Sequence, residues 1–364
     1  MNVLRKITAR VAVIGIAVGA ALALALVAEI VVRIVRPHLD PMVAFCASPG
    51  FRLDLEFPNQ LKATQFDAEL DWRLVPDLKE LPWCGTPVTT NSDGIRMDRP
   101  LSPKAPGTVR IVCLGDSVTF GYGVPFYWEG KWSENEKSYP QVIEAAFRGG
   151  GDPRSVGSVE VITLACPGYT SEQGRMWFLR MADRLDADIV TACFGRNDVM
   201  SFGVPDRRVR TGGVAEKVIR ATAPYSQAMT HLVAYSRARK SAPANPPGLD
   251  YSRLSLEESV ENFWQLAQAV RGRGAEFIVI APVYRDLQEE PTEGARMAAL
   301  RGALHKLCEQ GGLRWLEVPE LSERGHPDNG KLFMERIHPN VEGHQLLGQR
   351  AAEFLREIVA QRRR

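Results

Sequence analysis

A serine and a histidine that stand far apart in the chain are of the residue types that acyl transfer requires. Ser117 lies in Leu-Gly-Asp-Ser, directly after the apolar run of residues 109–114, where a strand would present its hydroxyl group at the edge of a sheet. His338 lies in Glu-Arg-Ile-His-Pro-Asn near the C-terminus, and an imidazole can accept a proton near neutral pH. Gly-Asp-Ser by itself is not specific, because Asp116 or Ser117 can also serve only as the cap of a helix.

Two further polar motifs follow the next two apolar runs. Cys-Pro-Gly-Tyr-Thr comes after residues 159–165, and Gly-Arg-Asn-Asp begins at the end of residues 188–195. Each motif has a structural alternative: Gly168 after a proline suits a type II turn, and Asn197 can bond the backbone of its own loop. Because the carboxyl ends of parallel strands meet at one edge of a sheet, we expect the motifs to converge there.

The apolar runs alternate with helical patterns, which predicts a parallel sheet covered by helices on both faces. Thr170 with Gln173 and Ser255 with Glu258 fit capping boxes, which predict two helix starts. We therefore expect an α/β fold of three layers, α/β/α, around a central, mainly parallel five-stranded sheet. The expected strands are residues 109–114, 159–165, 188–195, 276–281 and 313–318, and the expected helices are residues 138–147, 171–185, 256–271, 293–308 and 341–360.

Taken together and in order, the motifs resemble the four sequence blocks of the SGNH (GDSL-like) hydrolase family, which is named after its Ser, Gly, Asn and His residues. The resemblance covers about residues 109–354. Residues 71–76 and 91–96 also look like the lead-in segments of membrane-anchored bacterial members. The resemblance implies a flavodoxin-like SGNH hydrolase fold and a serine esterase that needs no metal and no cofactor.

The resemblance also assigns a role to each matching residue. Ser117 is the nucleophile, and His338 is the general base that removes its proton. The oxyanion hole, which stabilises the developing negative charge, consists of the backbone N–H groups of Ser117 and Gly168 and the side-chain amide of Asn197.

The acid that would orient the imidazole departs from the family pattern. Where the family has an aspartate three residues before the histidine, this chain has Glu335, whose extra methylene group changes where the backbone must lie. We expect Glu335 to complete a triad with His338. Asp328 is the reserve candidate, and a Ser-His dyad without an acid is the other alternative. Two more carboxylates, Asp116 and Asp198, are expected to support the site by holding loops through N–H bonds.

The N-terminus contains an apolar segment long enough to cross a bilayer. Residues 11–28 carry no charge and the apolar run continues past Glu29, so that 22 residues span about 33 Å as a helix. We expect a short cytoplasmic tail at residues 1–10, a transmembrane signal-anchor helix at residues 11–35 in the inner membrane, and the rest outside the cytoplasm, periplasmic or extracellular. A cleaved signal peptide is the alternative, because Ala21-Leu22-Ala23 has the spacing that peptidases accept.

The remainder divides into a membrane-proximal segment and the hydrolase domain. The former is rich in Pro, Asp and Leu without sustained periodicity, which predicts short strands and turns, including a turn at Asn91-Ser92-Asp93-Gly94. An Arg- and Pro-rich stretch interrupts the alternation and is expected to be an insertion over the site. The expected ranges are residues 36–106 for the first segment, 107–364 for the domain and 199–250 for the insertion, with helical pieces at 214–223 and 226–239.

Composition excludes several other classes of protein. The formal net charge of +2, from 45 basic and 43 acidic residues, provides no field that would gather nucleic acid. Cys113, Cys166 and Cys193 lie in or beside runs expected to be buried strands, and no Cys or His group has metal-ligand spacing. Cys46 and Cys84 could pair in an oxidising compartment, but spacing alone does not decide this.

Three functions are compatible with the sequence. The leading prediction is hydrolysis of an acyl ester, such as an acetyl ester, on an envelope glycan or a lipid. An O-acyltransferase would pass the acyl group from the same acyl-enzyme to an exported polysaccharide, and it would need an envelope partner to bring the acyl donor across the membrane. The third alternative is an inactive glycan-binding protein of the envelope, for which Glu335 is the only support.

Overall fold

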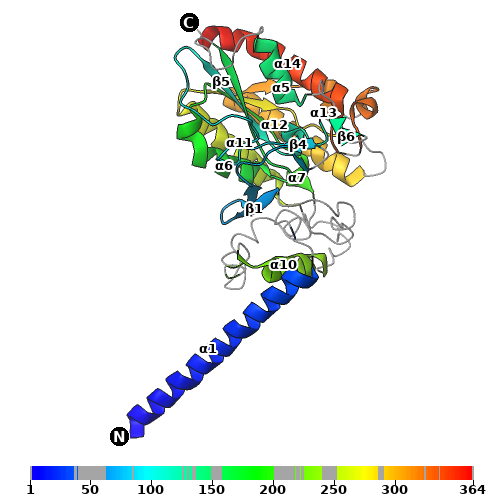
Figure 1. The fold of residues 1–364 in the computed structure, drawn as a ribbon. Helices are drawn as coiled ribbons and strands as arrows, with labels where there is room; N and C mark the ends of the chain where they lie inside the picture. The colour runs from blue at the N-terminus through cyan, green and yellow to red at the C-terminus, as the bar shows by residue number, and fades with distance from the viewer. Residues whose placement is uncertain are drawn as a thin grey trace.

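The chain forms a body built around a central sheet, from which one long N-terminal helix extends (Figure 1). The computed structural model describes residues 2–36, 39, 63–83, 86–124, 127–128, 131–132, 137–148, 158–200, 218, 222, 225–239, 252–285, 291–323, 325–335 and 337–362. Within these residues, the expected α/β fold of three layers is confirmed.

The central sheet has five parallel strands in the order β11-β10-β9-β5-β8. Every residue of β5, β8 and β9 is buried, because helices cover both faces, and this burial explains the continuous apolar runs in the sequence. The strands are β5 (Val109–Gly115), β8 (Val159–Ala165), β9 (Ile189–Cys193), β10 (Glu276–Ile280) and β11 (Arg314–Leu316).

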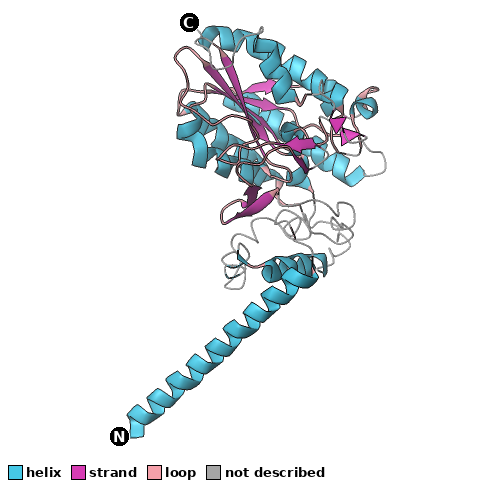
Figure 2. Cartoon of the chain, in the orientation of Figure 1, coloured by secondary structure: helices cyan, strands magenta, loops and turns pink. Residues whose placement is uncertain are grey.

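Two hydrophobic clusters lie on the two faces of the sheet, and the helices that form them flank the strands in Figure 2. One cluster contains Phe178 and Phe263, and the other contains Ile143 and Leu347. The first face carries α6 (Ser171–Leu185), α11 (Leu256–Arg271) and α12 (Pro291–Gly311), and the second carries α5 (Tyr139–Arg148), α13 (Pro319–Ser322) and α14 (Val341–Arg362).

Local sequence signals predicted the helix starts well and the strand ends less well. Both capping boxes are present, at Thr170 and at Ser255, and they begin α6 and α11 where expected. The strand expected at residues 313–318 is shorter, because the Leu313 N–H bonds the Cys308 carbonyl at the end of α12 instead of a neighbouring strand. The helix expected at residues 293–308 is longer at both ends.

The segment before the main sheet consists of short hairpins and turns, as expected for its described part. The strands are β1 (Thr64–Asp67), β2 (Asp71–Leu74), β3 (Leu81–Trp83) and β4 (Thr86–Val88), and a third hairpin, β6 (Tyr127–Trp128) with β7 (Lys131–Trp132), follows β5. The predicted turn is confirmed, because the Gly94 N–H bonds the Asn91 carbonyl at 2.9 Å and Gly94 has a φ of 74°.

The N-terminal helix α1 (Asn2–Val35) contains the expected apolar segment. Its part from Arg10 to Val35 has 26 residues, is long and apolar enough to cross a membrane, and is not buried against the body. Helix α10 (Gln227–Arg239) corresponds to the piece expected at residues 226–239. The piece expected at residues 214–223 lies outside the described residues except for two positions.

The described cysteines behave as small hydrophobic residues. Cys113, Cys166 and Cys193 are buried in or beside strands, as expected, and Cys308 is buried as well. Cys46 and Cys84 both lie outside the described residues, so their pairing stays a prediction.

A buried ion pair ties the amino ends of the strands together, at the edge opposite to Gly115. Arg110 of β5 donates from Nε to Glu160 of β8 at 2.7 Å, and its other nitrogens donate to the carbonyls of Leu185 and Ser102, both at 2.8 Å. The Arg110 side chain is only 1% exposed. Removing it would leave the buried Glu160 carboxylate with only the more distant contact to Arg99, at 3.7 Å, among the ion pairs of the described residues.

We therefore expect Arg110→Ala to lower the free energy of unfolding by about 3–5 kcal/mol, measured by urea denaturation. The matched control is Arg314→Ala, which removes the exposed ion pair with Glu276 in the same sheet and should cost about 0–1 kcal/mol. Equal losses in the two variants would contradict a special role for the buried pair.

Candidate active site

Ser117 stands at the carboxyl end of the central strand β5, at the start of the short helix α4 (Ser117–Phe120). The Asp116 carboxylate caps this helix by accepting the Val118 N–H at 2.9 Å. Gly115 allows the turn, because a Cβ there would lie 1.9 Å from the Thr119 hydroxyl oxygen and 2.7 Å from the Cys193 carbonyl. The strand-to-helix transition thus places the Ser117 hydroxyl group at the sheet edge, as the sequence predicted.

His338 reaches the same edge from the loop between the 3-10 helix η2 (Asn329–Leu332) and α14. Its Nε2 lies 2.9 Å from the Ser117 Oγ, although the two residues are 221 positions apart. The Tyr122 ring stacks on the imidazole, with centroids 4.0 Å apart and planes 12° apart. The loop is closed behind the histidine, because the Met334 N–H bonds the His338 carbonyl at 3.0 Å.

Glu335 lies on the other side of the imidazole. One carboxylate oxygen, Oε1, is 2.5 Å from His338 Nδ1 and also accepts the His338 backbone N–H at 3.1 Å. The other oxygen accepts the Ile337 N–H at 3.0 Å. The carboxylate therefore folds back over its own loop, which accommodates the extra methylene group. Asp328, the reserve candidate, instead pairs with Lys331 on the surface.

Burial and the neighbouring carboxylate act on the imidazole in opposite directions. Burial lowers the pKa of His338, while the hydrogen bond and the charge of Glu335 raise it, and the net shift is downward. For Glu335, burial raises the pKa, but the bonds from His338 and Ile337 outweigh burial and hold the pKa below its usual value. At neutral pH this favours a neutral imidazole beside an ionised carboxylate, which is the state that a general base needs.

The Gly168 loop is a tight turn after β8. The Tyr169 N–H bonds the Cys166 carbonyl at 3.2 Å, and Gly168 has a φ of 80°, so Pro167 and Gly168 form a type II turn. Two side chains from distant segments hold it: Trp72 Nε1 donates to the Pro167 carbonyl at 3.2 Å, and an Arg253 nitrogen donates to the Gly168 carbonyl at 2.5 Å.

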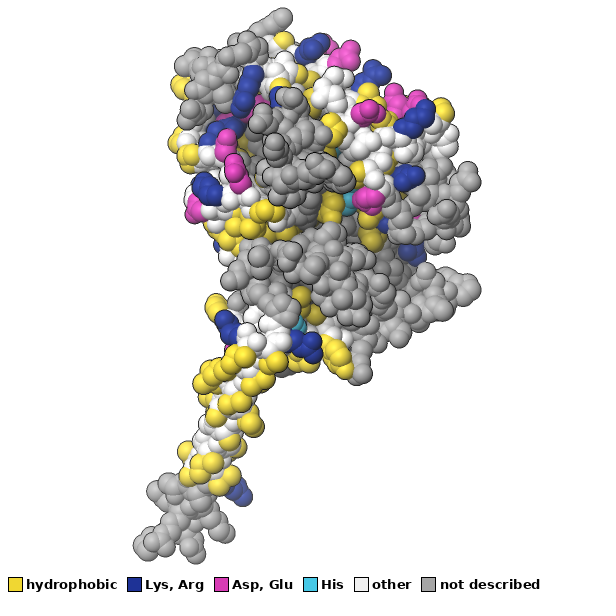
Figure 3. All heavy atoms as spheres, turned by 45° about the vertical axis from the view of Figure 1, so that its right-hand side comes forward, with side chains coloured by type: hydrophobic (Ala, Val, Ile, Leu, Met, Phe, Trp, Pro, Cys, Tyr) yellow, Lys and Arg dark blue, Asp and Glu magenta, His cyan; other side chains and the backbone are white. Residues whose placement is uncertain are grey.

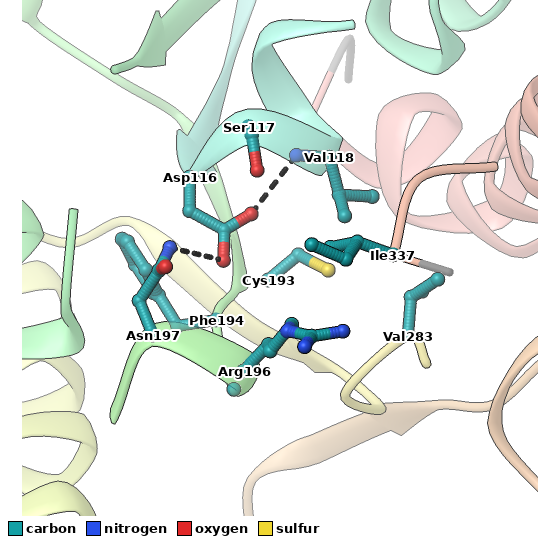
Figure 4. A pocket seen from close by; sticks show the side chains of 10 residues that line it. Asp116, Ser117, Val118, Cys193, Phe194, Arg196, Asn197, Val283 and Ile337 are labelled. Carbon is teal, nitrogen blue, oxygen red and sulfur yellow. Dashed lines mark hydrogen bonds between the residues drawn. The ribbon is translucent and has the colours of Figure 1, made fainter. Parts of the chain in front are cut away.

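Asn197 lies on the short helix α7 (Arg196–Val199) after β9 and joins the first two loops. Its side-chain amide donates to the Tyr169 carbonyl at 3.1 Å and to Asp116 at 3.3 Å, beside Ser117 (Figure 4). The amide group thus contacts the residue directly before Ser117. Both of its N–H groups have protein partners in this structure.

The two supporting aspartates are fully buried and hold loops, as expected. Burial raises the pKa of Asp116 to about 7, against the lowering effect of the Val118 N–H. Burial likewise raises the pKa of Asp198 to about 6. Asp198 accepts the backbone N–H of Ser171 at 2.8 Å and its hydroxyl at 2.6 Å, which joins the Asn197 loop to α6.

A small pocket opens beside the Ser117 hydroxyl group. Its volume of about 20 Å³ leaves room for little more than one water-sized group. Val283 and Ile337 provide apolar wall, and the buried Arg196 guanidinium group points into it (Figure 4). Arg196 pairs with Glu293 at 3.0 Å, so the charge at this end of the pocket is compensated.

Sequence reasoning missed the side chains that hold and shape the site. Trp72 belongs to the recognised lead-in motif, and Arg196 directly precedes Asn197, so both had a motif signal but no assigned role. Tyr122 and Arg253 had no signal, because their partners at His338 and Gly168 are distant in sequence.

No metal is indicated by the donor groups in the part of the chain that the structure describes. Within it, no group of three or more His, Cys, Asp or Glu side chains could hold a metal ion.

Comparison with known proteins agrees with this arrangement of motifs. The model of the GDSL-like lipase/acylhydrolase family matches residues 113–346. A lipase/acylhydrolase from Enterococcus faecalis is similar in structure, with 16% identity, a TM-score of 0.44, and coverage of 69% of this chain and 96% of that one. An acetylxylan esterase from Geobacillus stearothermophilus has 16% identity and a TM-score of 0.41, over 69% of this chain and 94% of that one. No curated protein matches the sequence.

The opposing effects on His338 lead to a prediction about pH. Glu335→Gln removes the charge that raises the pKa of His338, so this pKa falls further. Neutral His338 then persists to lower pH, and we expect the acid limb of kcat/KM for ester hydrolysis to move to lower pH. The maximal rate should fall about 10²–10⁴-fold, because the imidazolium that forms during the reaction loses its carboxylate.

The control for this prediction is Asp328→Asn, which removes an exposed carboxylate from the preceding turn. It should change neither the acid limb nor the maximal rate. An unshifted limb in Glu335→Gln, or an equal shift in the control, would contradict the assignment of Glu335.

Proposed function

Because the chain belongs to the GDSL-like lipase/acylhydrolase family and is a hydrolase that acts on ester bonds, we propose that it cleaves a carboxylic ester through an acyl-enzyme on Ser117. The observation that carries the proposal is the hydrogen-bonded chain from Ser117 through His338 to Glu335. The contact between Glu335 and the imidazole argues against an inactive binding protein, for which the departure at Glu335 was the only support.

The reaction proceeds in two halves. Ser117 Oγ attacks the ester carbonyl carbon while His338 Nε2 takes the hydroxyl proton. The tetrahedral intermediate collapses, the bond to the alcohol oxygen breaks, and His338 gives its proton to the leaving alcohol. Water then attacks the acyl-enzyme with His338 again as the base, which releases the carboxylic acid and restores the Ser117 hydroxyl group.

The oxyanion of each intermediate needs fixed donors. We assign these to the backbone N–H groups of Ser117 and Gly168 and to the amide of Asn197. Support comes from the tight turn at Gly168 and from the amide position beside Asp116. To donate to the oxyanion, the Asn197 amide gives up its longer hydrogen bond, the one to Asp116. The hydrogen bond to the Tyr169 carbonyl keeps the amide oriented.

The acyl group is short, and an acetyl group is the best candidate. The pocket beside Ser117 is small and ends at the compensated charge of Arg196, which supports a short acyl group. The alcohol part belongs to an envelope glycan or a lipid. In this proposal, α1 anchors the protein in the inner membrane and the catalytic domain lies outside the cytoplasm.

A fluorophosphonate probe tests the nucleophile directly. We expect the full-length protein to form a covalent adduct on Ser117, localised by peptide mass spectrometry, and to hydrolyse short-chain acyl esters faster than long-chain ones. Ser117→Ala should abolish both labelling and hydrolysis while leaving the melting temperature within a few degrees. The proposed mechanism would be wrong if the wild-type protein took no label, or if Ser117→Ala retained activity.

The oxyanion assignment predicts a specific kinetic change. Asn197→Ala should lower kcat about 10²–10³-fold, corresponding to about 2.7–4 kcal/mol of barrier, because a donor to the transition state is lost. KM should change little, since the ground-state ester does not need this donor. An unchanged melting temperature of the variant would show that the fall in kcat does not come from loosening of the loops that carry Tyr169 and Asp116. A rise in KM with unchanged kcat would contradict the assignment.

A further inference from the structure

A single acidic side chain in the apolar part of α1 connects this helix to the body. Glu29 accepts hydrogen bonds from the Ser226 hydroxyl at 2.8 Å and from the backbone N–H groups of Gln227 and Ala228 at 2.9 and 3.0 Å. It also pairs with Arg33, one turn further along α1, at 2.6 Å. The carboxylate therefore occupies the N-terminus of α10.

This contact fixes where α10 lies along α1. A negative charge at a helix N-terminus is favourable, because the first N–H groups have no partner within the helix and the helix dipole is positive there. The Gln227 side chain adds a second contact by accepting the Leu39 N–H at 2.8 Å. Glu29 stands six residues before the end of α1 at Val35, about 9 Å along the axis, so α10 starts close to the end of the apolar segment.

The two faces of α10 have different surroundings. Val233 is buried in the hydrophobic core cluster of the body. At about 100° per residue, Leu232 and Tyr235 lie about 100° and 160° around the helix from Val233. Their side chains are 53% and 55% exposed, and Tyr225, just before the helix, is 82% exposed. The exposed face of the described part of α10 thus carries one large apolar and one aromatic side chain, Leu232 and Tyr235.

Figure 1 shows α10 between the body and α1, so the face turned away from the body is on the side from which α1 departs. In Figure 3, hydrophobic side chains cover most of the coloured part of α1 and continue at its junction with the body.

We propose that α10 is an interfacial helix that lies on the lipid surface of the membrane crossed by α1, with Leu232, Tyr225 and Tyr235 at the level of the lipid headgroups. The proposal rests on the proposed membrane anchor. A helix that lies in the interface buries its apolar face at the boundary between headgroups and acyl chains. Tyrosine is favoured at this depth, because its ring is apolar and its hydroxyl group can remain hydrated.

Lipid accounts for this surface better than a protein partner does. The segment Arg10–Val35 is not buried against the body, so a membrane-crossing α1 is surrounded by lipid along its length. The exposed face of α10 begins beside the end of that segment, through the Glu29 contact. The same bilayer that covers α1 therefore reaches the exposed face of α10 without a second binding partner.

The stretch that carries α10 begins and ends at the active-site loops. The Arg253 N–H bonds the Met200 carbonyl at 3.0 Å, and the Leu254 N–H bonds the Asp198 carbonyl at 3.0 Å, which closes the base of this stretch. Arg253 in turn holds the Gly168 carbonyl. Because Val233 of α10 also packs in the core cluster of the body, a helix seated on the lipid holds the body close to the membrane and presents the site to esters at the membrane surface.

Photo-crosslinking in a bilayer tests the proposal. The full-length chain, in nanodiscs of phosphatidylethanolamine and phosphatidylglycerol, carries p-benzoylphenylalanine in place of Leu232, of Tyr235 or, as the control, of Leu179. Leu179 is also an exposed leucine, 40% exposed, but it lies on α6 of the body. After irradiation, mass spectrometry should find phospholipid adducts at positions 232 and 235 and none at position 179.

The alternative results are distinct. A crosslink from position 232 to a second copy of the chain, or a lipid yield no higher than at position 179, overturns the proposal while the anchor stands. The proposed anchor would be wrong if the purified protein had a mass that lacked the N-terminal segment, or if it were not retained with lipid. The proposed docking of α10 would then be wrong as well. Neither result bears on the proposed ester hydrolysis, because fluorophosphonate labelling of Ser117 tests that proposal separately.

A second variant tests the lock between the helices. Glu29→Gln removes the charged acceptor at the start of α10, so the lipid adduct yield at position 232 should fall about fivefold. Glu309→Gln, an equivalent change at an exposed position of α12, should leave the yield unchanged. Unchanged melting temperature and Ser117 labelling in Glu29→Gln show that the body remains folded. An undiminished yield in this variant contradicts the role of Glu29.

Discussion

The contact between the Ser117 hydroxyl group and the His338 imidazole is the constraint on which the rest of the site depends. A proton can pass between the two atoms only because they lie 2.9 Å apart, and 221 residues of chain must fold to bring them there. The parallel sheet makes this possible, since β5, which precedes Ser117, and the two neighbouring strands end at one edge. The loop that carries His338 lies directly before α14, and it closes over that edge.

A buried polar network keeps this contact in place. Asn197 bonds both the Tyr169 carbonyl and Asp116, so it links the ends of β5, β8 and β9 through a single amide. Asp116 and Asp198 are deeply buried, and burial raises the pKa of each carboxyl group, which makes their hydrogen bonds essential compensation. Catalytic geometry and fold stability thus rely on the same set of bonds.

If α1 crosses a membrane as proposed, its attachment to the body orients the site as well as anchoring it. Glu29 joins the apolar helix to α10, and Val233 of α10 packs in the core cluster of the body. An apolar helix on a flexible tether would leave the pocket free to face any direction.

The sequence alone determined what depends on neighbouring residues: the alternation of strands and helices, the capping boxes at Thr170 and Ser255, the turn at Gly94 and the order of the four motifs. It also indicated the class of chemistry, because the four motifs stand in the order of the hydrolase family whose model matches residues 113–346. The tertiary structure decided the strand order, the contact of Glu335 rather than Asp328 with the imidazole, and the support from Trp72, Tyr122 and Arg253. These depend on contacts between distant segments, whose distances and directions are set by packing and leave no periodic pattern in the chain.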